Sequence, residues 1–307
     1  MISSQPQSSQ ENVARRSAQF KPWRNFSEYI WVAPAFIFVL FFTFYAAAYA
    51  IWLSFYDYSL ASPVRPFIGT ENFQRLFQDA EYWQSLRRSL LFVAIDVPLT
   101  VGMGFALALL LNQPIRGRWL YRSLLLLPWV ISLVIAGYML KWIFAENTGI
   151  LNYLLSLAGI AQVPWLSSDA GAFATVVIAH AWRVYPFGMV ILLAGLQGIS
   201  KELYEAAMID GASGRQRLIH ITMPLLTPQF LILLILRTLL AFNMVDLIFT
   251  MTGGGPGNAT SFLSYMMYQR AFSYLDLGYA AAIGVTIFAI NIVLALVYFY
   301  VLRRNSA

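Results

Sequence analysis

Two arginines stand inside long apolar runs of the sequence, where a charged side chain is unusual. Arg183 lies in the run 171–197, and Arg237 lies in the run 225–249. A charge inside a membrane helix is costly, and it usually faces a bundle interior or a wet cavity. We therefore expect either an internal ion pair or hydrogen bond between helices, or a polar path through the middle of a bundle. The candidate companions are Asp96, Asn243, Asp246 and Asn291.

The other reactive residue types make no catalytic or metal-binding pattern. The only histidines, His180 and His220, are 40 positions apart, and the chain has no cysteine. Thiol catalysis, disulfides and zinc sites of the Cys/His type are therefore excluded, and no Ser-His-Asp arrangement stands out. We expect His180 to be a packed or hydrogen-bonded residue of its apolar run. A phosphate-binding loop needs Gly-Lys-Ser/Thr, and none of Lys21, Lys141 and Lys201 follows a glycine.

The composition places these residues in a membrane protein. Apolar residues make up 59% of the 307 residues and charged residues only 11%, whereas soluble domains carry about 25% charged residues. A soluble enzyme, a disordered chain and a disulfide scaffold are excluded. The net charge of +6 does not indicate nucleic acid, because the basic residues are scattered between apolar runs.

Six apolar runs are long enough to cross a bilayer, which takes about 20 residues per helix. The first run is too long for the core of a signal peptide, so we expect it to be retained. None of the runs alternates every second residue, which excludes a membrane barrel. The expected fold is an all-α polytopic bundle over 30–304, with a polar N-terminal tail over 1–29 and a short tail over 305–307. The runs cover 30–55, 89–111, 121–144, 171–197, 225–249 and 278–302.

The basic residues predict the orientation of the bundle. If the N-terminus is cytoplasmic, 12 of the 20 Lys and Arg residues lie in inner segments, six in outer segments and two within spans. This excess favours cytoplasmic termini at both ends. In the outer segment 57–88, the stretch 71–88 is amphipathic, and we expect it to lie along the outer membrane surface.

The inner segment 198–224 has the pattern of a helix, a turn and a second helix. Leu203, Ala207 and Met208 recur at helical spacing, and Gly211 can adopt the left-handed conformation that ends a helix. A second short helix is expected over 212–220, and Pro224 and Pro228 suit the opening turn of the next span. From physics alone, this segment is equally well interpreted as an interfacial connector or as a docking element for a partner.

The spacing within this segment resembles the EAA loop of ABC-importer permeases, E-A-A-x3-G-x9-I-x-L-P. The matching residues are Glu205, Ala206, Ala207, Gly211, Ile221 and Pro224; Met223 replaces Leu, and Ser200 stands where the family usually has Pro. Further segments are similar to the carbohydrate-uptake branch, the maltose and glycerol-phosphate type. They are Phe67-Ile-Gly-Thr-Glu-Asn-Phe73, Leu127-Pro-Trp129, Trp182-Arg-Val-Tyr-Pro-Phe-Gly-Met189, Ala194-Gly-Leu-Gln197, Ala241-Phe-Asn243 and the Gly-rich stretch 252–260.

The resemblance implies a six-span permease with the type I ABC-importer (maltose-permease-like) fold, in a bacterial or archaeal cytoplasmic membrane. It implies that the EAA helix couples the spans to a separate ATPase, and that the chain itself is not an enzyme. The implied partners are a second, homologous permease subunit, two ATPase subunits that hold ATP and Mg, an extracytoplasmic sugar-binding protein and the lipid bilayer. The implied substrate path for an oligosaccharide or sugar derivative contains Trp129, Trp182, Arg183, Phe187, Arg237 and Asn243.

Two alternatives stay open at this point. An ion-driven secondary transporter would place acidic residues and unwound helices at mid-membrane, and Asp96 and Asp246 are the candidate acids. A membrane-embedded enzyme would need a catalytic set at one membrane face, and the sequence contains no such set. The two arginines of the path also suit a phosphate or carboxylate, so an anionic sugar is a variant of the main hypothesis.

Overall fold

The computed structural model describes the backbone of residues 26–305 and the side chains of residues 32–300. In this part of the chain the regular structure is helical, and the β pairing consists of two isolated bridges, Tyr56–Phe67 and Ser59–Asp276. The all-α expectation is confirmed. Most of the expected N-terminal tail, and the end of the C-terminal tail, lie outside the described residues.

The chain divides into two units, Met1–Tyr49 and Ala50–Ala307, which are described separately. Helix α2 (Phe26–Leu53) begins in the first unit and ends in the second. In the first unit its side chains are apolar and mostly exposed, and the rings of Phe41 and Tyr45 stack with centroids 5.7 Å apart. A helix with apolar side chains all round is suited to a lipid environment, as expected for the first span.

The second unit contains three more helices that are long and apolar enough to cross a membrane: α4 (Ala80–Asn112), α8 (Asp169–Gln197) and α15 (Leu277–Asn305). Two further segments qualify only as bent pairs. Helix α5 (Arg118–Val130) meets α6 (Leu133–Ile143) at 96°, and the segment Gly214–Leu225 meets α12 (Thr227–Phe242) at 64°. With α2, four helices qualify directly, and six spans result if each bent pair is one span.

Two of the expected continuous spans are broken, and the break in the second lies beyond α12, apart from the 64° bend at Leu226. The run 121–144 divides at Ile131 and Ser132, whose backbones are extended (ψ 133° and 140°). Pro128 lies three residues before this break, and proline removes a helical hydrogen bond. The run 225–249 also divides, because α12 ends at Asn243 and α13 (Asp246–Met251) begins beyond it. The Asn243 side-chain amide donates to the Leu239 carbonyl (2.7 Å) and so completes the end of α12.

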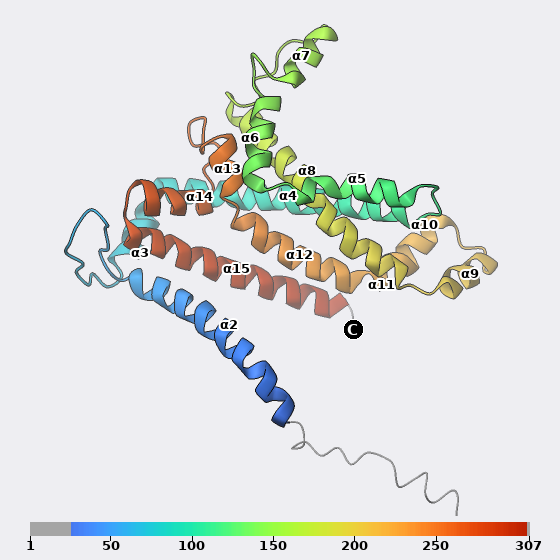
Figure 1. Cartoon of the computed structure of the whole chain (residues 1–307), viewed down its shortest axis with the longest axis horizontal. Helices are drawn as coiled ribbons and strands as arrows, with labels where there is room; N and C mark the ends of the chain where they lie inside the picture. Colours follow the sequence, from blue (N-terminus) through green and yellow to red (C-terminus); the bar gives the residue numbers. More distant parts are fainter. Residues whose placement is uncertain (1–25, 306–307) are drawn as a thin grey trace, which may run out of the picture. The chain divides into compact units, whose positions relative to one another are not determined.

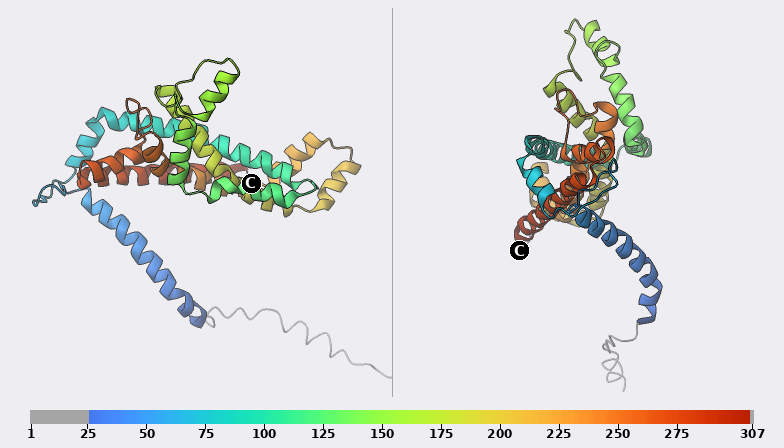
Figure 2. Two further views of the ribbon diagram at one scale, coloured as in Figure 1. Left: turned by 45° about the horizontal axis from the view of Figure 1, so that its top comes forward. Right: turned by 90° about the vertical axis from the view of Figure 1, so that its left-hand side faces the viewer.

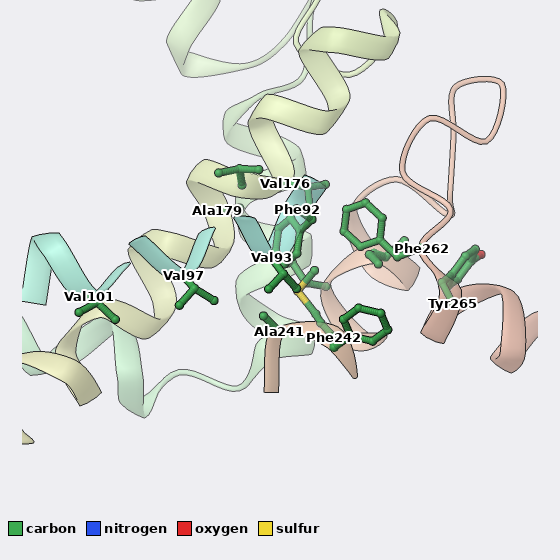
Figure 3. Packing of buried hydrophobic residues seen from close by; sticks show 14 of the residues in the cluster. Phe92, Val93, Val97, Val101, Val176, Ala179, Ala241, Phe242, Phe262 and Tyr265 are labelled. Atoms are coloured by element: carbon green, nitrogen blue, oxygen red, sulfur yellow. The ribbon is translucent and has the colours of Figure 1, made fainter. Parts of the chain in front are cut away.

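The core of the second unit is built on the contact between α4 and α8 (Figure 1). Gly104 brings the two backbones together: a Cβ at this position would lie 2.9 Å from the Met189 nitrogen of α8. Figure 3 shows the neighbouring core, in which α4 and α8 side chains meet those of α12 and of Phe262, before α14 (Leu263–Tyr268). The labelled residues are Phe92, Val93, Val97, Val101, Val176, Ala179, Ala241, Phe242, Phe262 and Tyr265.

Ionic contacts join the elements at one end of the unit. Helix α3 (Glu71–Gln78) and the start of α4 approach the π-helical turn η2 (Gln269–Ser273) and the start of α15. Arg270 pairs with Glu81 (2.9 Å), and the Tyr279 hydroxyl donates to Asp79 (2.7 Å). The amphipathic stretch 71–88 is divided between α3 and the first turns of α4. The chain turns at Asp79, whose carboxylate accepts from the Glu81 backbone N–H and caps α4.

The expected helix–turn–helix lies at the opposite end of the unit (Figures 1 and 2). It consists of α9 (Lys201–Ile209), α10 (Gly214–Arg217), the π-helical turn η1 (Leu218–Thr222) and α11 (Met223–Leu225). Ser200 caps α9, which fixes its start, and Gly211 has φ +79° at the turn. The second helix begins at Gly214, two residues later than expected, because Ser213 and Gln216 form a capping box.

Between α6 and α8 the structure adds a helix that the sequence patterns did not predict, α7 (Ile150–Leu157). Asn152 holds it in place: its amide donates to the Glu146 and Val163 carbonyls and accepts from the Trp165 indole N–H (2.9 Å). This buried amide is fully used in local structure, and α7 contributes nothing to the site described below.

Candidate functional site

A cavity of about 420 Å³ lies in the second unit, among α5, α6, α8, α12 and α13. Both helix breaks border it, at 131–132 and at 243–245. Five of the six expected path residues line it: Trp129, Arg183, Phe187, Arg237 and Asn243. The other lining residues are Leu133, His180, Val184, Leu240, Met244, Val245 and Asp246.

The sixth expected residue, Trp182, lies outside this cavity and packs against the hydrophobic core. Successive residues of a helix point about 100° apart, and Trp182 lies outside the face of α8 that lines the cavity. The lining residues of α8 instead follow the spacing i, i+3, i+4 and i+7 of one helix face. These residues are His180, Arg183, Val184 and Phe187.

Arg183 joins the cavity to the break between α5 and α6. Its Nε donates to the Ile131 carbonyl at 2.6 Å. That carbonyl stands at the end of α5, where the following backbone is extended and helical hydrogen bonding stops. Arg183 therefore stabilises the broken segment, and it is only partly buried, so the rest of its guanidinium lies at the cavity surface.

Arg237 belongs to a buried cluster with Asp96 and His180. Asp96 Oδ1 lies 2.8 Å from His180 Nδ1, and Asp96 Oδ2 lies 3.5 Å from an Arg237 terminal nitrogen. The three side chains are 0%, 4% and 4% exposed for Asp96, His180 and Arg237. Asp96 Oδ2 and two Arg237 nitrogens make no hydrogen bond, so this contact is an ion pair without hydrogen-bond geometry.

The cluster bears on the expectations for His180 and Arg237. His180 is hydrogen-bonded and packs beside Phe92 (centroids 5.3 Å apart), as expected. Arg237 forms the internal ion pair that the sequence offered as one interpretation, and it also lines the cavity. Asp96 on α4 thus pairs with Arg237 on α12, and this contact between helices holds the Arg237 guanidinium at the cavity wall.

The cavity combines an aromatic wall with polar groups. The rings of Trp129 and Phe187 lie 5.9 Å apart at 42°, and Trp129 is 45% exposed. Arg183, Asn243 and Asp246 supply guanidinium, amide and carboxylate groups. Such a lining can stack the C–H face of a ring and bond its hydroxyl groups. Within residues 26–305 no group of three or more His, Cys, Asp and Glu side chains could hold a metal.

The EAA-like residues lie far from the cavity, at the α9 end. Glu205 and Ala206 are exposed on α9, Ala207 is half-buried, and Gly211 forms the left-handed turn. Ile221 and Pro224 follow on η1 and α11. The Tyr204 hydroxyl lies 2.9 Å from Thr222 Oγ1 and ties α9 to the segment that leads into α12. The arrangement presents a short, tethered helix with a low, accessible face.

Comparison with known proteins identifies the family. The sequence profile described as "Binding-protein-dependent transport system inner membrane component" matches residues 99–307. The chain belongs to this family. The permease is 38% identical over 276 residues to the sulfoquinovosyl glycerol transport system permease protein SmoG of Agrobacterium fabrum, covering 90% of each chain. It is 36% identical over 275 residues to the trehalose/maltose transport system permease protein MalF of Thermococcus litoralis, covering 90% of this chain and 93% of the relative.

These findings confirm the expected membership of the carbohydrate-uptake branch and identify the chain as a transport component, not an enzyme. The fold agrees with that of a bacterial ABC transporter for the acidic polysaccharide alginate. A chain of that transporter, solved with an alginate pentasaccharide-bound periplasmic protein, superposes with a TM-score of 0.81 at 22% identity. The match covers 92% of the permease and 96% of that chain, which confirms the type I permease fold.

Part of this lining was not predicted from the sequence. Asp246 was expected as a companion for the arginines or as an acid of an ion-driven carrier, not as a path residue. The apolar lining residues Leu133, Val184, Leu240, Met244 and Val245 were not singled out. The helix-face spacing of Arg237, Leu240 and Met244 was the available signal. The position of Leu133 depends on the break before α6, which no local spacing predicts.

Proposed function

We propose that the permease carries an oligosaccharide or sugar derivative into the cytoplasm through the cavity between α5, α6, α8, α12 and α13. The observation that carries this proposal is the lining itself, which sets the Trp129–Phe187 wall beside Arg183, Asn243 and Asp246. A sugar presents C–H faces to aromatic rings and hydroxyl groups to such donors and acceptors. The names of relatives, with sulfoquinovosyl glycerol, trehalose/maltose and glycerol-3-phosphate among them, support the same substrate class.

The charges at the cavity favour hydroxyl groups over an obligatory anion. Arg237 is neutralised by Asp96, and the exposed carboxylate of Asp246 offsets Arg183 at the same wall. The formal charges of these four side chains sum to zero. An anionic group can still pair with Arg183, but the lining as a whole does not select for one.

Energy would come from separate ATPase subunits seated on α9. The exposed face of Glu205, Ala206 and Ala207 allows close approach of a partner, and Gly211 makes the tight turn behind it. A stiff helix at the tip of a loop can pass a rigid-body movement to α12 through η1 and α11. ATP and Mg would bind to these ATPase subunits, and this chain would hold no cofactor.

The assembly that follows from this function has four kinds of component. The permease would pair with a second, homologous permease subunit, two ATPase subunits and an extracytoplasmic sugar-binding protein. It would lie in the cytoplasmic membrane of a bacterium or archaeon with both termini and α9 in the cytoplasm, consistent with the distribution of Lys and Arg.

An ion-driven carrier is the second candidate, because the α5–α6 and α12–α13 breaks border the cavity and Asp96 is buried beside it. Such breaks and buried acids are typical of ion-coupled transporters. Asp96, however, is already paired with Arg237 and His180. The exposed helix α9 would have no function in such a carrier. Family membership also favours the ATP-driven function.

The proposal is tested by co-purification of the tagged permease from its native membrane in mild detergent. We expect a Walker-motif ATPase and a second six-span protein with the wild type. Glu205→Lys should lose the ATPase and retain the second permease, because the altered charge lies on the exposed face of α9. Glu71→Lys, the same charge reversal on exposed α3 at the other end, is the control and should retain both partners. Loss of neither partner in Glu205→Lys, with normal uptake, would refute the role of α9.

A further inference from the structure

A second cavity, of about 570 Å³, lies at the α9 end of the second unit and is lined by three basic side chains. Arg118 and Arg122 come from the first turns of α5, and Lys201 opens α9. No Asp or Glu is among its lining residues in the described part of the chain. This basic cavity is therefore a concentration of positive charge between elements about 80 residues apart in sequence.

The positive charges of the basic cavity lack counter-charges. In residues 32–300, no carboxylate lies within ion-pair distance of Arg118, Arg122 or Lys201. Arg122 Nε and one of its terminal nitrogens are shielded from solvent and have no hydrogen-bond partner. Donors left in this state are costly, so the site is incomplete without an acceptor.

The N-terminus of α5 also favours an anion in the basic cavity. The helix begins after Gly117 with no side-chain cap and no acidic residue in its first turn. Helix N-termini favour negative charge and disfavour positive charge, yet this one carries Arg118 and Arg122. An anion beside Arg118 would offset both the positive end of the helix and the arginine side chains.

The position of the basic cavity indicates which anion it takes. Asn112, the last residue of α4, and Gln197, the last residue of α8, both line it. Because these residues end apolar spans, the cavity lies at the depth of lipid headgroups. Trp119, which is 73% exposed, and Leu124, which is 53% exposed, supply apolar surface on the same helix for the acyl chains.

We propose that the basic cavity binds the phosphate group of an anionic phospholipid headgroup. Arg118 and Arg122 present guanidinium groups to the phosphate oxygens, and Lys201 contributes a point charge. The bound lipid links α5 to α9 and steadies the exposed helix that the ATPase would use. Basic pockets between membrane helices bind lipid headgroups in the same way. This inference is independent of the transported substrate.

Binding is measured by native mass spectrometry of the assembled transporter, titrated with phosphatidylglycerol or phosphatidylcholine of the same acyl chains. We expect selective retention of phosphatidylglycerol by the wild type. Arg122→Gln should weaken that retention by about tenfold, as for loss of a charge-assisted hydrogen bond, and Arg122→Lys should weaken it less. The control, Arg87→Gln, removes an exposed arginine of α4 far from the cavity and should bind like the wild type. Because bound lipid is counted on intact complexes, loss of yield in a variant does not obscure the result.

Three results would overturn the proposal. The first is equal retention of both lipids, or equal weakening by Arg122→Gln and Arg87→Gln. The second is displacement of phosphatidylglycerol by millimolar inorganic phosphate, which would make the ligand a free phosphate. The third is phosphatidylglycerol binding only after the ATPase subunits dissociate, which would mean that a carboxylate of the ATPase fills the cavity.

Discussion

Replacing Asp96 by Asn removes the negative charge of the buried cluster and leaves its shape almost unchanged. The Asn oxygen can still accept from His180 Nδ1, which now lies 2.8 Å from the carboxylate. The Asn amide nitrogen, however, would face the Arg237 guanidinium, a donor against a donor. Arg237 is 4% exposed and has no other ion-pair partner among the described residues. The variant therefore isolates the consequence of leaving this one charge uncompensated.

The expected loss is about 3 kcal/mol in the free energy of unfolding. Breaking a buried ion pair costs about 3–5 kcal/mol, and an unpaired arginine in a membrane helix costs about 2.5–3.5 kcal/mol. We take the lower end because Arg237 borders the cavity, where water can approach it. Thermal unfolding of the purified protein in detergent should show a midpoint lowered by roughly 6 °C, since one kcal/mol shifts domains of this size by about 2 °C.

The double variant Asp96→Asn/Arg237→Gln provides the decisive comparison. Removing both charges should restore stability to within about 1 kcal/mol of the wild type, because no uncompensated charge remains. An unchanged midpoint in the single variant would show that water already solvates Arg237. A double variant as unstable as the single one would show that packing, not charge, sets the stability of the cluster. Either result would show that an uncompensated Arg237 charge does not set the stability of the protein.

Three further substitutions test the packing, the turn and the cavity wall. Gly104→Ala should cost about 2 kcal/mol in unfolding free energy, as in other overpacked cores, because its Cβ meets the α8 backbone; Gly102→Ala, with open space at its Cβ, is the control. Gly211→Ala should cost about 1–2 kcal/mol, because φ is +79°, and should reduce binding-protein-stimulated ATPase activity, whereas Gly214→Ala should not. Trp129→Ala should lower the initial rate of uptake by about tenfold, and Trp129→Phe should retain most of it; equal rates for both would exclude ring stacking.

The order of helix, turn and helix over 198–224 could be predicted because its signals are local. Gly211 takes the expected left-handed conformation, and Pro224 lies in the opening turn of the next helix. The caps at Ser200 and Ser213 were not predicted, and the second helix starts two residues later than expected. Local spacing therefore predicts the turn but not the exact bounds of the two helices.

The breaks in the third and fifth spans could not be predicted in the same way. Pro128 lies near a break, but Pro98 and Pro186 lie inside the continuous helices α4 and α8. A proline in a membrane helix is tolerated where neighbours satisfy the freed backbone groups. At the first break the neighbour is Arg183, whose side chain donates to the Ile131 carbonyl from 52 residues away. No pattern in the local sequence indicates this contact.

For the buried cluster, the sequence predicted which residue types need partners but not which residues pair. The depth of Arg237 in its run predicted a polar companion, and Asp96 was one of four candidates. The choice among them depends on which helices pack together, and α4 contacts both α8 and α12. His180 joins the cluster for the same reason, although its own spacing shows no link to Asp96.

Uptake into proteoliposomes shows whether ATP drives a sugar through this cavity. The assembled transporter is reconstituted with ATP inside, and a labelled sugar held by its binding protein is added outside. We expect uptake that requires ATP and the binding protein, and that falls in Trp129→Ala and Glu205→Lys but not in Glu71→Lys. Uptake that continues without ATP and stops when a protonophore removes the ion gradient would show that the permease is an ion-driven carrier.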